Sequence, residues 1–167
     1  LASEFGEMLF THYGVSGPII LTLSSIAGEA VTTGPARLTI DLKPALSVEQ
    51  LDARLRRDIA ALGTASYPAL LKRLLPRLLV PVFQERSGIA RDQAVSQLTA
   101  EQRGRVITLL KEFDLTIVAT RPISEAIITV GGVSTREIDP RTMASRLVSG
   151  LYFAGEVIDV AGDTGGF

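Results

Sequence analysis

The sequence predicts an α+β fold in which strands from both ends of the chain form a small sheet or barrel, with a helical unit inserted between them. Two observations predict this. Short apolar or alternating runs occur near both ends, whereas the middle third carries repeated helix-start signals. A chain of 167 residues is also long enough for one full core or two small ones. We therefore expect a strand-rich segment over residues 1–43, a helical insert over 44–113, returning strands over 114–130 and a C-terminal segment over 131–167.

The strand-rich segment should contain two strands and one helix. Glu7–Thr11 predicts a strand. Ser16–Pro18 predicts a helix start, because Ser is a good N-cap and Pro is tolerated in the first turn. The apolar run Ile19–Ile26 would form this helix, and we expect it to be mostly buried. Arg37–Leu42 alternates polar and apolar residues, which is typical of a half-buried strand.

Two capping boxes mark the helical insert. Ser47–Gln50 places a Gln three residues after a Ser, and Thr99–Gln102 places a Gln three residues after a Thr. We expect the second helix to run to about Phe113. After the first box, apolar residues recur at helical spacing and predict one buried face, made of Leu51, Leu55, Ile59 and Leu62.

Shorter helices are expected between the two boxes. Ser66 is a suitable N-cap for one of them. Pro76 and Pro81 interrupt the following apolar segment, so the helix there must kink or restart. Gly88 should end it.

Strands are expected to return after the insert. Leu115–Thr120 and Ala126–Val130 predict two strands, separated by Arg121 and Pro122. Leu151–Ala154 predicts a further short, apolar strand.

The amino-acid composition argues against several classes of site and partner. The net charge of −1, the low aromatic content and the absence of Trp give no bulk signal for a nucleic-acid partner. Zero cysteines exclude disulfides, iron–sulfur ligation and thiol catalysis, and fit a reducing cytoplasm. A single histidine, His12, argues against a histidine-based metal site. No apolar run reaches membrane-spanning length and no signal peptide is recognised, so we expect a cytoplasmic protein without a membrane partner.

The C-terminal segment carries the most informative chemistry. Gly155 ends the predicted strand and allows a ligand to approach, and the Glu156 carboxylate can accept hydrogen bonds from hydroxyl groups. Thr164-Gly165-Gly166 predicts the start of a helix whose free N–H groups would face an anionic or electron-rich ligand. The pattern indicates a site for a polyhydroxyl ligand.

Four stretches, in order and spacing, resemble bacterial NAD(P)/FAD-dependent oxidoreductases of the YhiN/BaiN type: Gly6–Pro18, Thr129–Val133, Glu137–Met143 and Gly150–Phe167. Residues from about 30 to 120 match only in general character. The resemblance implies a Rossmann-like flavoprotein with bound FAD, reduced by NAD(P)H or by a small-molecule substrate. The chain departs from the family at Ala144, Arg146 and Phe167, which weakens the inference for the loop 142–147.

The resemblance also implies residue roles. Glu156 would accept hydrogen bonds from the FAD ribityl chain, and a pair of glycines after a strand would lie beside the flavin. The implied cofactor-binding residues are Gly131, Gly132, Gly155, Glu156, Asp159, Thr164, Gly165 and Gly166. The structural alternatives are a solvated loop carboxylate for Glu156, a simple turn for Gly131 and Gly132, and a flexible tail for Gly165 and Gly166.

One histidine and three arginines each have both a functional and a structural interpretation. His12 is either a general acid near the flavin or a buried histidine that ties a strand end to the helix. Arg54, Arg56 and Arg57 could bind a nucleotide phosphate, although a solvated helix face is the preferred interpretation.

No G-x-G-x-x-G loop is found in the sequence, although the family grips the dinucleotide with one. We therefore expect this chain to be a piece of a longer oxidoreductase: the insert region and the beginning of the returning FAD domain, inactive alone. Its partner would be the N-terminal dinucleotide-binding domain of the same protein. The alternatives are a piece of a flavin-dependent tRNA-modifying enzyme and a stand-alone protein-interaction module.

Overall fold

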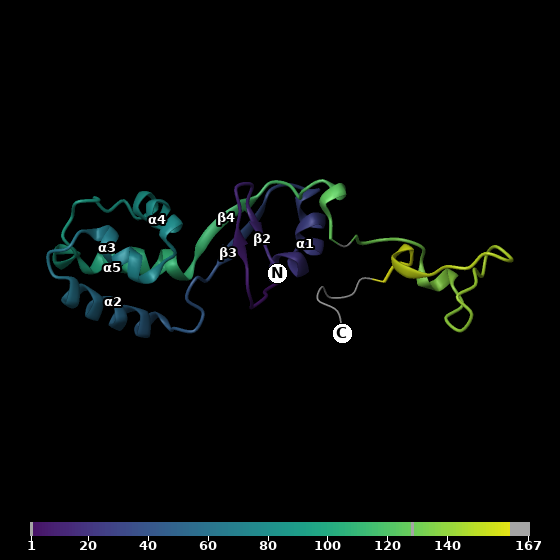
Figure 1. The fold of residues 1–167 in the computed structure, drawn as a ribbon, viewed down its shortest axis with the longest axis horizontal. Helices are drawn as coiled ribbons and strands as arrows, with labels where there is room; N and C mark the ends of the chain where they lie inside the picture. The colour runs from purple at the N-terminus through teal and green to yellow at the C-terminus, as the bar shows by residue number, and fades with distance from the viewer. Residues whose placement is uncertain (1, 128, 161–167) are drawn as a thin grey trace. The chain divides into compact units, whose positions relative to one another are not determined.

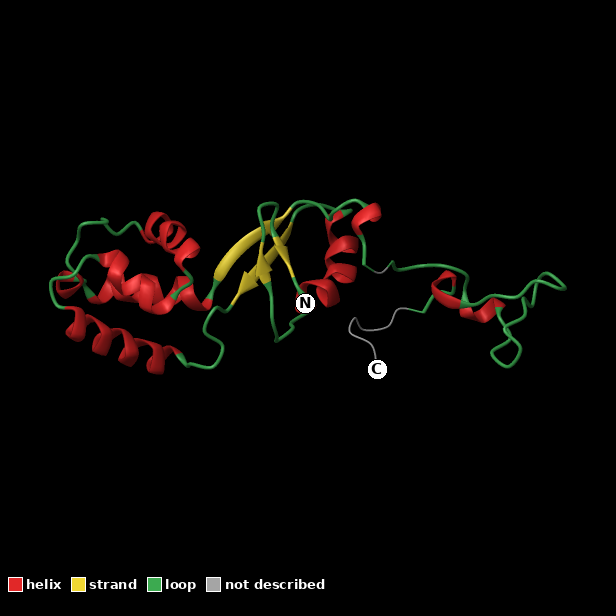
Figure 2. Cartoon of the chain, viewed as in Figure 1, coloured by secondary structure: helices red, strands yellow, loops and turns green. Residues whose placement is uncertain are grey.

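The computed structural model describes residues 2–127 and 129–160 (Figure 1). These residues divide into two compact units. We call 37–116 the helical unit; the other, the two-segment unit, combines described residues of 1–36 and 117–160. The fold class is α+β, as the sequence predicts (Figure 2). The described strands form two separate two-stranded sheets and no closed barrel.

The two-segment unit begins with a hairpin followed by a helix. Strands β1 (Leu9–Phe10) and β2 (Val15–Ser16) pair antiparallel, with Leu9 opposite Ser16. Helix α1 (Pro18–Val31) follows directly. Its N-cap is Gly17, not Ser16, because Ser16 is paired in β2. Gly17 has φ of 106°, and a Cβ there would lie 2.9 Å from the Met8 Cα, so the close approach of this turn to the chain before β1 needs a glycine.

The expectation that the α1 segment is mostly buried is wrong. The helix contains no buried residue, and Ile26 is more than half exposed. An apolar run predicts that a helix has something to bury, but the partner must come from elsewhere in the fold. Among the described residues, α1 has too few neighbours to cover it.

Two of the expected returning strands are not formed. The described residues of Ala126–Val130 are not in a strand, and of Leu151–Ala154 only Tyr152 makes a bridge, to Ala144. A 3-10 helix at Ile123–Glu125 follows Pro122 and turns the chain. Because a strand needs a partner, an apolar run without a paired neighbour remains irregular.

The helical unit packs four helices around one core. These are α2 (Val48–Leu62), α3 (Tyr67–Leu74), α4 (Val80–Ser87) and α5 (Ala100–Lys111). Helix α2 packs on α3 and α5, and α4 packs on α3 and α5. The largest fully buried side chains come from all four helices and from Val95: Leu51, Leu55, Tyr67, Leu70, Leu71, Phe83, Val106 and Leu110.

Both capping boxes are formed. The Ser47 side chain accepts a hydrogen bond from the Gln50 backbone N–H, and Thr99 does the same for Gln102. Ser66 stands at the N-cap of α3 but makes no such side-chain bond. On the predicted α2 stripe, Leu51 and Leu55 are buried and the last two apolar positions are half-buried.

The prolines and Gly88 act as expected. Helix α3 ends before Pro76, a 3-10 turn follows, and α4 restarts with Pro81 in its first turn. Gly88 ends α4 in the left-handed conformation, with φ of 64°.

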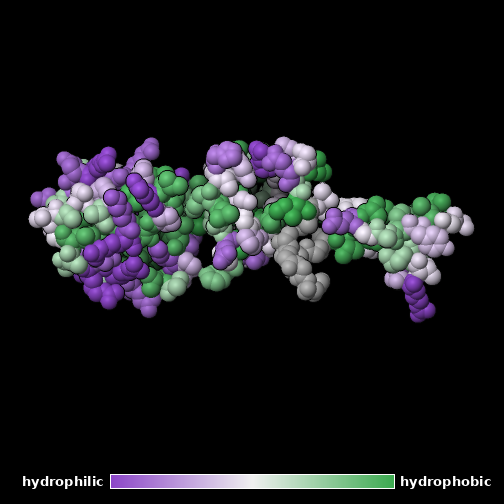
Figure 3. All heavy atoms as spheres, viewed as in Figure 1, coloured by the Kyte–Doolittle hydropathy of each residue, from purple (hydrophilic) through white to green (hydrophobic). Residues whose placement is uncertain are grey.

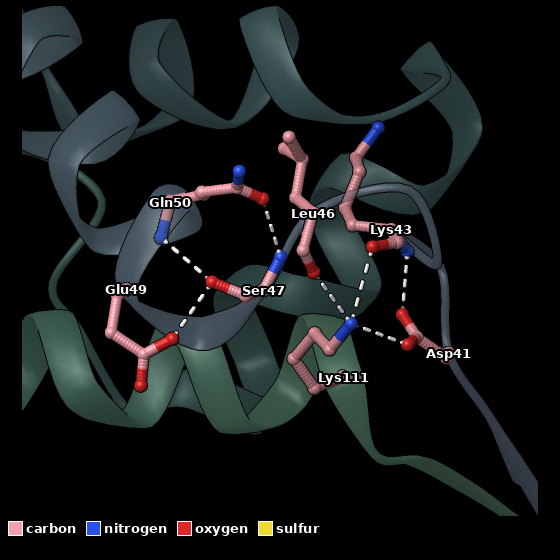
Figure 4. A network of polar contacts seen from close by, with 7 residues as sticks. All are labelled: Asp41, Lys43, Leu46, Ser47, Glu49, Gln50 and Lys111. Carbon is pink, nitrogen blue, oxygen red and sulfur yellow. Dashed lines mark hydrogen bonds and ion pairs between the residues drawn. The ribbon is translucent and has the colours of Figure 1, made fainter.

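Strands β3 (Ala36–Ile40) and β4 (Phe113–Ile117) pair where the chain enters and leaves the helical unit. The burial of β3 alternates as the sequence predicts. Arg37 and Thr39 both bond the Asp114 carboxylate, at 2.6 and 2.7 Å. Figure 4 shows how Lys111 ties the loop before α2 to the end of α5. Its Nζ donates to the Leu46 carbonyl at 2.9 Å and lies 2.5 Å from Asp41 Oδ2.

Candidate functional site

Two segments predicted to touch the cofactor lie side by side in the two-segment unit. Val133 and Ile158 form an isolated parallel bridge. The Val133 N–H donates to the Val157 carbonyl at 2.8 Å, and the Asp159 N–H donates to the Val133 carbonyl at 2.9 Å. This bridge joins the segment that holds Gly131 to the one that holds Glu156.

Backbone geometry explains why glycine is needed in these segments. Gly132 has φ of 146°, and a Cβ there would lie 2.5 Å from the Val157 carbonyl oxygen. Its glycine therefore permits the contact between the two segments and requires no ligand. Gly131 (φ 101°) and Gly155 (φ 79°) differ, since no described atom lies within 4 Å of a Cβ placed on either. Their backbones are open to approach.

Acidic side chains flank this open backbone. Glu156 lies in the 3-10 helix Gly155–Val157 and is exposed. No described residue bonds or pairs with its carboxylate. Asp159 is also exposed, and its backbone is held by the bridge to Val133. A free carboxylate beside open glycine backbone suits a ligand with several hydroxyl groups, because each hydroxyl can donate to the carboxylate.

Three predicted cofactor residues, Thr164, Gly165 and Gly166, fall outside the described residues of the chain. The site is therefore defined here by Gly131, Gly132 and the segment 155–159.

His12 is exposed in the turn of the β1–β2 hairpin, so it is not the buried histidine of one interpretation. Its ring packs edge-on against Tyr13, with centroids 4.9 Å apart. The Arg121 guanidinium lies 4.5 Å from the centre of the Tyr13 ring and also pairs with Glu125. Sequence reasoning missed this cluster, because Tyr13 and Arg121 are separated by more than one hundred residues.

Two of the three α2 arginines are held in ion pairs. Arg54 and Arg56 are engaged in ion pairs with Asp58 and Asp52, and Arg57 is exposed. Arginines from neighbouring helices join the same carboxylates: Arg73 bonds Asp58, and Arg103 bonds Asp52. No local pattern in the sequence signals these two partners, because they come from α3 and α5.

A metal site and a membrane-spanning helix were also sought among the described residues. The described residues contain no group of three or more His, Asp or Glu side chains able to hold a metal ion. None of the helices in the described ranges is both long and apolar enough to cross a membrane.

Comparison with known proteins places the chain in a family. The sequence model of the HI0933-like protein barrel and H2TH domain matches residues 1–128. The chain therefore belongs to the HI0933-like family.

Among individual proteins, the chain is 33% identical over 165 residues to the ribosomal RNA dihydrouridine synthase of Haemophilus influenzae, covering 99% of the chain and 39% of that protein. It is 36% identical to the Escherichia coli ribosomal RNA dihydrouridine synthase, covering 96% of the chain and 38% of that protein. It is also 31% identical to the 3-dehydro-bile acid delta(4,6)-reductase of Clostridium scindens, covering 100% of the chain and 41% of that protein. The chain thus spans about two-fifths of the length of these curated relatives.

Proposed function

We propose that this chain belongs to a flavin-dependent reductase, in which it supplies a substrate-side insert and some of the FAD contacts. The single observation that carries the proposal is the Val133–Ile158 bridge. It joins the two segments that the flavoprotein resemblance assigns to FAD, in a chain that belongs to the HI0933-like family. The absence of cysteines is consistent with the cytoplasmic location that we propose for this reductase.

The names of the relatives point to one kind of reaction. A dihydrouridine is a uridine whose ring carbon–carbon double bond has gained two hydrogens. A delta(4,6)-reductase acting on a 3-dehydro compound likewise saturates a double bond conjugated with a ketone. We propose the same class here: addition of a hydride and a proton across a carbon–carbon double bond conjugated with a carbonyl. Bound FAD would supply the hydride after reduction by NADH or NADPH.

The chain's own residues would bind and orient the cofactor. The Glu156 carboxylate would accept hydrogen bonds from the ribityl hydroxyls. Gly131 and Gly155 would allow backbone contact with the cofactor, because nothing described fills the space where a side chain would stand. Gly132 would hold the two segments together. Asp159, in the same segment as Glu156, would add negative charge to the site.

The test is to purify the longer protein that contains this chain. Bound flavin is measured by absorbance, and its reduction by NADH and by NADPH is followed without oxygen. The reduced protein is then offered a 3-keto steroid with conjugated double bonds, or a ribosomal RNA transcript, and the product is analysed by mass for the gain of two hydrogens. Folded protein that takes up no flavin, even after incubation with FAD, would overturn the proposal.

A further inference from the structure

Charge is distributed unevenly between the two units. Residues 37–116 contain 13 Lys and Arg against 9 Asp and Glu, a net charge of +4. Because the whole chain has a net charge of −1, the rest of the sequence has −5. The small total charge therefore hides a basic helical unit and does not describe the partners that this unit would attract.

The ion pairs on α2 do not neutralise its arginines. Asp58 is shared by two arginines, Arg54 of α2 at 3.6 Å and Arg73 of α3 at 3.2 Å. Asp52 is likewise shared by Arg56, at 2.8 Å, and Arg103. Each cluster of two guanidiniums and one carboxylate keeps one positive charge in excess. The aspartates hold the guanidiniums in place and leave charge available for an outside anion.

Further positive charge lies on the same side of the unit. Arg57 is exposed, and within the described ranges no acidic side chain pairs with it. A shallow open groove runs along α2, lined by Leu46, Gln50, Ala53, Arg54, Arg56, Arg57 and Asp58. Hydrophilic side chains gather over much of the viewed face of the helical unit, at the left of Figure 3.

We propose that this basic face, made of Arg54, Arg56, Arg57 and Arg73, binds the phosphate backbone of base-paired RNA. The inference rests on the proposed function and names the class of substrate that the helical unit would hold. Guanidinium groups match phosphate oxygens in a two-pronged arrangement, which ammonium groups do not. Two of the relatives carry ribosomal RNA in their names.

The helical unit exposes no aromatic side chain, which favours paired over single-stranded RNA. The helical unit contains three aromatic residues, Tyr67, Phe83 and Phe113, and all are buried. Single strands are held largely by stacking of bases on aromatic rings, whereas double-stranded RNA is recognised by its shape and its backbone. The face has the groups for backbone contact and lacks those for stacking.

The 167-residue chain is titrated with a fluorescent RNA duplex of about 20 base pairs, and binding is followed by anisotropy. A labelled oligouridine of the same length is the single-stranded comparison. Titrations run from about 50 to about 200 mM salt, because each phosphate contact contributes to the salt dependence of the affinity. The duplex should bind more tightly than the oligouridine. Arg57→Glu should lower duplex affinity about tenfold and reduce the salt slope by about one.

Arg136→Glu is the matched control. Arg136 is exposed in the two-segment unit, none of the described residues pairs with it, and the substitution changes the net charge equally. It should leave duplex affinity within about twofold of wild type, since Arg136 is not one of the arginines of the basic face and general charge repulsion is screened by salt. Equal weakening by both substitutions would overturn the proposal, as would tighter binding of oligouridine or no duplex binding at the lowest salt. The urea midpoint checks folding, and Arg57→Gln replaces Arg57→Glu if the latter unfolds.

The reductase assignment and the RNA-binding inference can be tested independently of each other. Flavin content and flavin reduction in the longer protein test the reductase assignment without RNA. If these are normal while Arg57→Glu leaves RNA binding intact, the RNA-binding inference falls and the reductase assignment stands.

Discussion

Glu156 is the residue on which the cofactor assignment depends. Its carboxylate is exposed beside open glycine backbone, and no described side chain competes for it. In the longer protein, Glu156→Ala should lower FAD affinity roughly tenfold to a hundredfold, since a hydrogen bond to a charged group is worth about 1.5–3 kcal/mol. Glu156→Gln should be milder, because its carbonyl oxygen still accepts. Absorbance of retained flavin after dilution measures both.

His12→Ala serves as the comparison in the same protein. Because His12 is exposed in a hairpin turn, its removal should change the free energy of unfolding by less than about 0.5 kcal/mol. Flavin content and flavin reduction by the nicotinamide should stay at wild-type values. A slower substrate step at full flavin content would instead assign the proton donor to His12. Full flavin occupancy and wild-type release in Glu156→Ala would remove Glu156 from the site.

The ion pairs of Asp52 make the stability of the fold depend on pH. Hydrogen bonding to Arg103, and more weakly to Arg56, lowers the Asp52 pKa below its ordinary value. A carboxyl group with a lowered folded pKa stabilises the fold above its unfolded pKa, about 3.9, and loses that contribution as pH falls through the lower folded value. The urea concentration at the unfolding midpoint should therefore decrease as the pH drops below about 4. Asp52→Asn should make this decrease smaller.

Asp92→Asn is the control for this prediction. Asp92 is an exposed turn residue, and nothing in the described ranges pairs with its side chain. Its replacement should leave the acid profile unchanged. Profiles of Asp52→Asn and wild type that coincide throughout would show that the Arg103 contact does not stabilise the fold.

At the scale of elements, α2 is held by its buried face. Leu55 is fully buried where α2 meets α3 and α5. Leu55→Ala should cost roughly 2–5 kcal/mol of unfolding free energy, because a cavity would remain in a packed core. Chemical denaturation measures the change. An unmoved midpoint would mean that this face is not core.

Gly104→Ala should have the opposite sign. Gly104 lies within α5, and no described atom is within 4 Å of the position its Cβ would take. Alanine should stabilise the helix by roughly 0.5–1 kcal/mol, since glycine loses more backbone freedom on folding. The pair of substitutions separates loss of packing from a general sensitivity of the unit to mutation.

At the scale of the whole molecule, the isolated chain should not retain FAD. Its sequence has no G-x-G-x-x-G loop for the pyrophosphate, and the described site offers one bridge and two acidic side chains. Contacts this few do not offset the entropy lost on association. Equilibrium dialysis against FAD tests this. Micromolar binding would show that the chain holds the cofactor without a dinucleotide-binding domain.

The sequence predicted the helical unit well because its signals are local. A capping box needs four consecutive residues, and Pro81 or Gly88 restricts the backbone wherever it stands. The candidate site was predicted less completely. The family resemblance points to Gly131, and residue chemistry together with the resemblance points to Glu156, but nothing in their spacing predicts that Val133 pairs with Ile158.

By itself, the sequence determined the main helix starts and stops of the helical unit, the fold class and the glycines and carboxylates available for a cofactor. Tertiary structure decided which of these meet. It left α1 without a buried residue and Ala126–Val130 without a strand among its described residues, because burial and pairing depend on distant partners. It also brought Arg73 of α3 to the same carboxylate as Arg54 of α2, so that the arginines of the basic face come from two helices. Charge interactions depend on distance in space, which sequence order does not set.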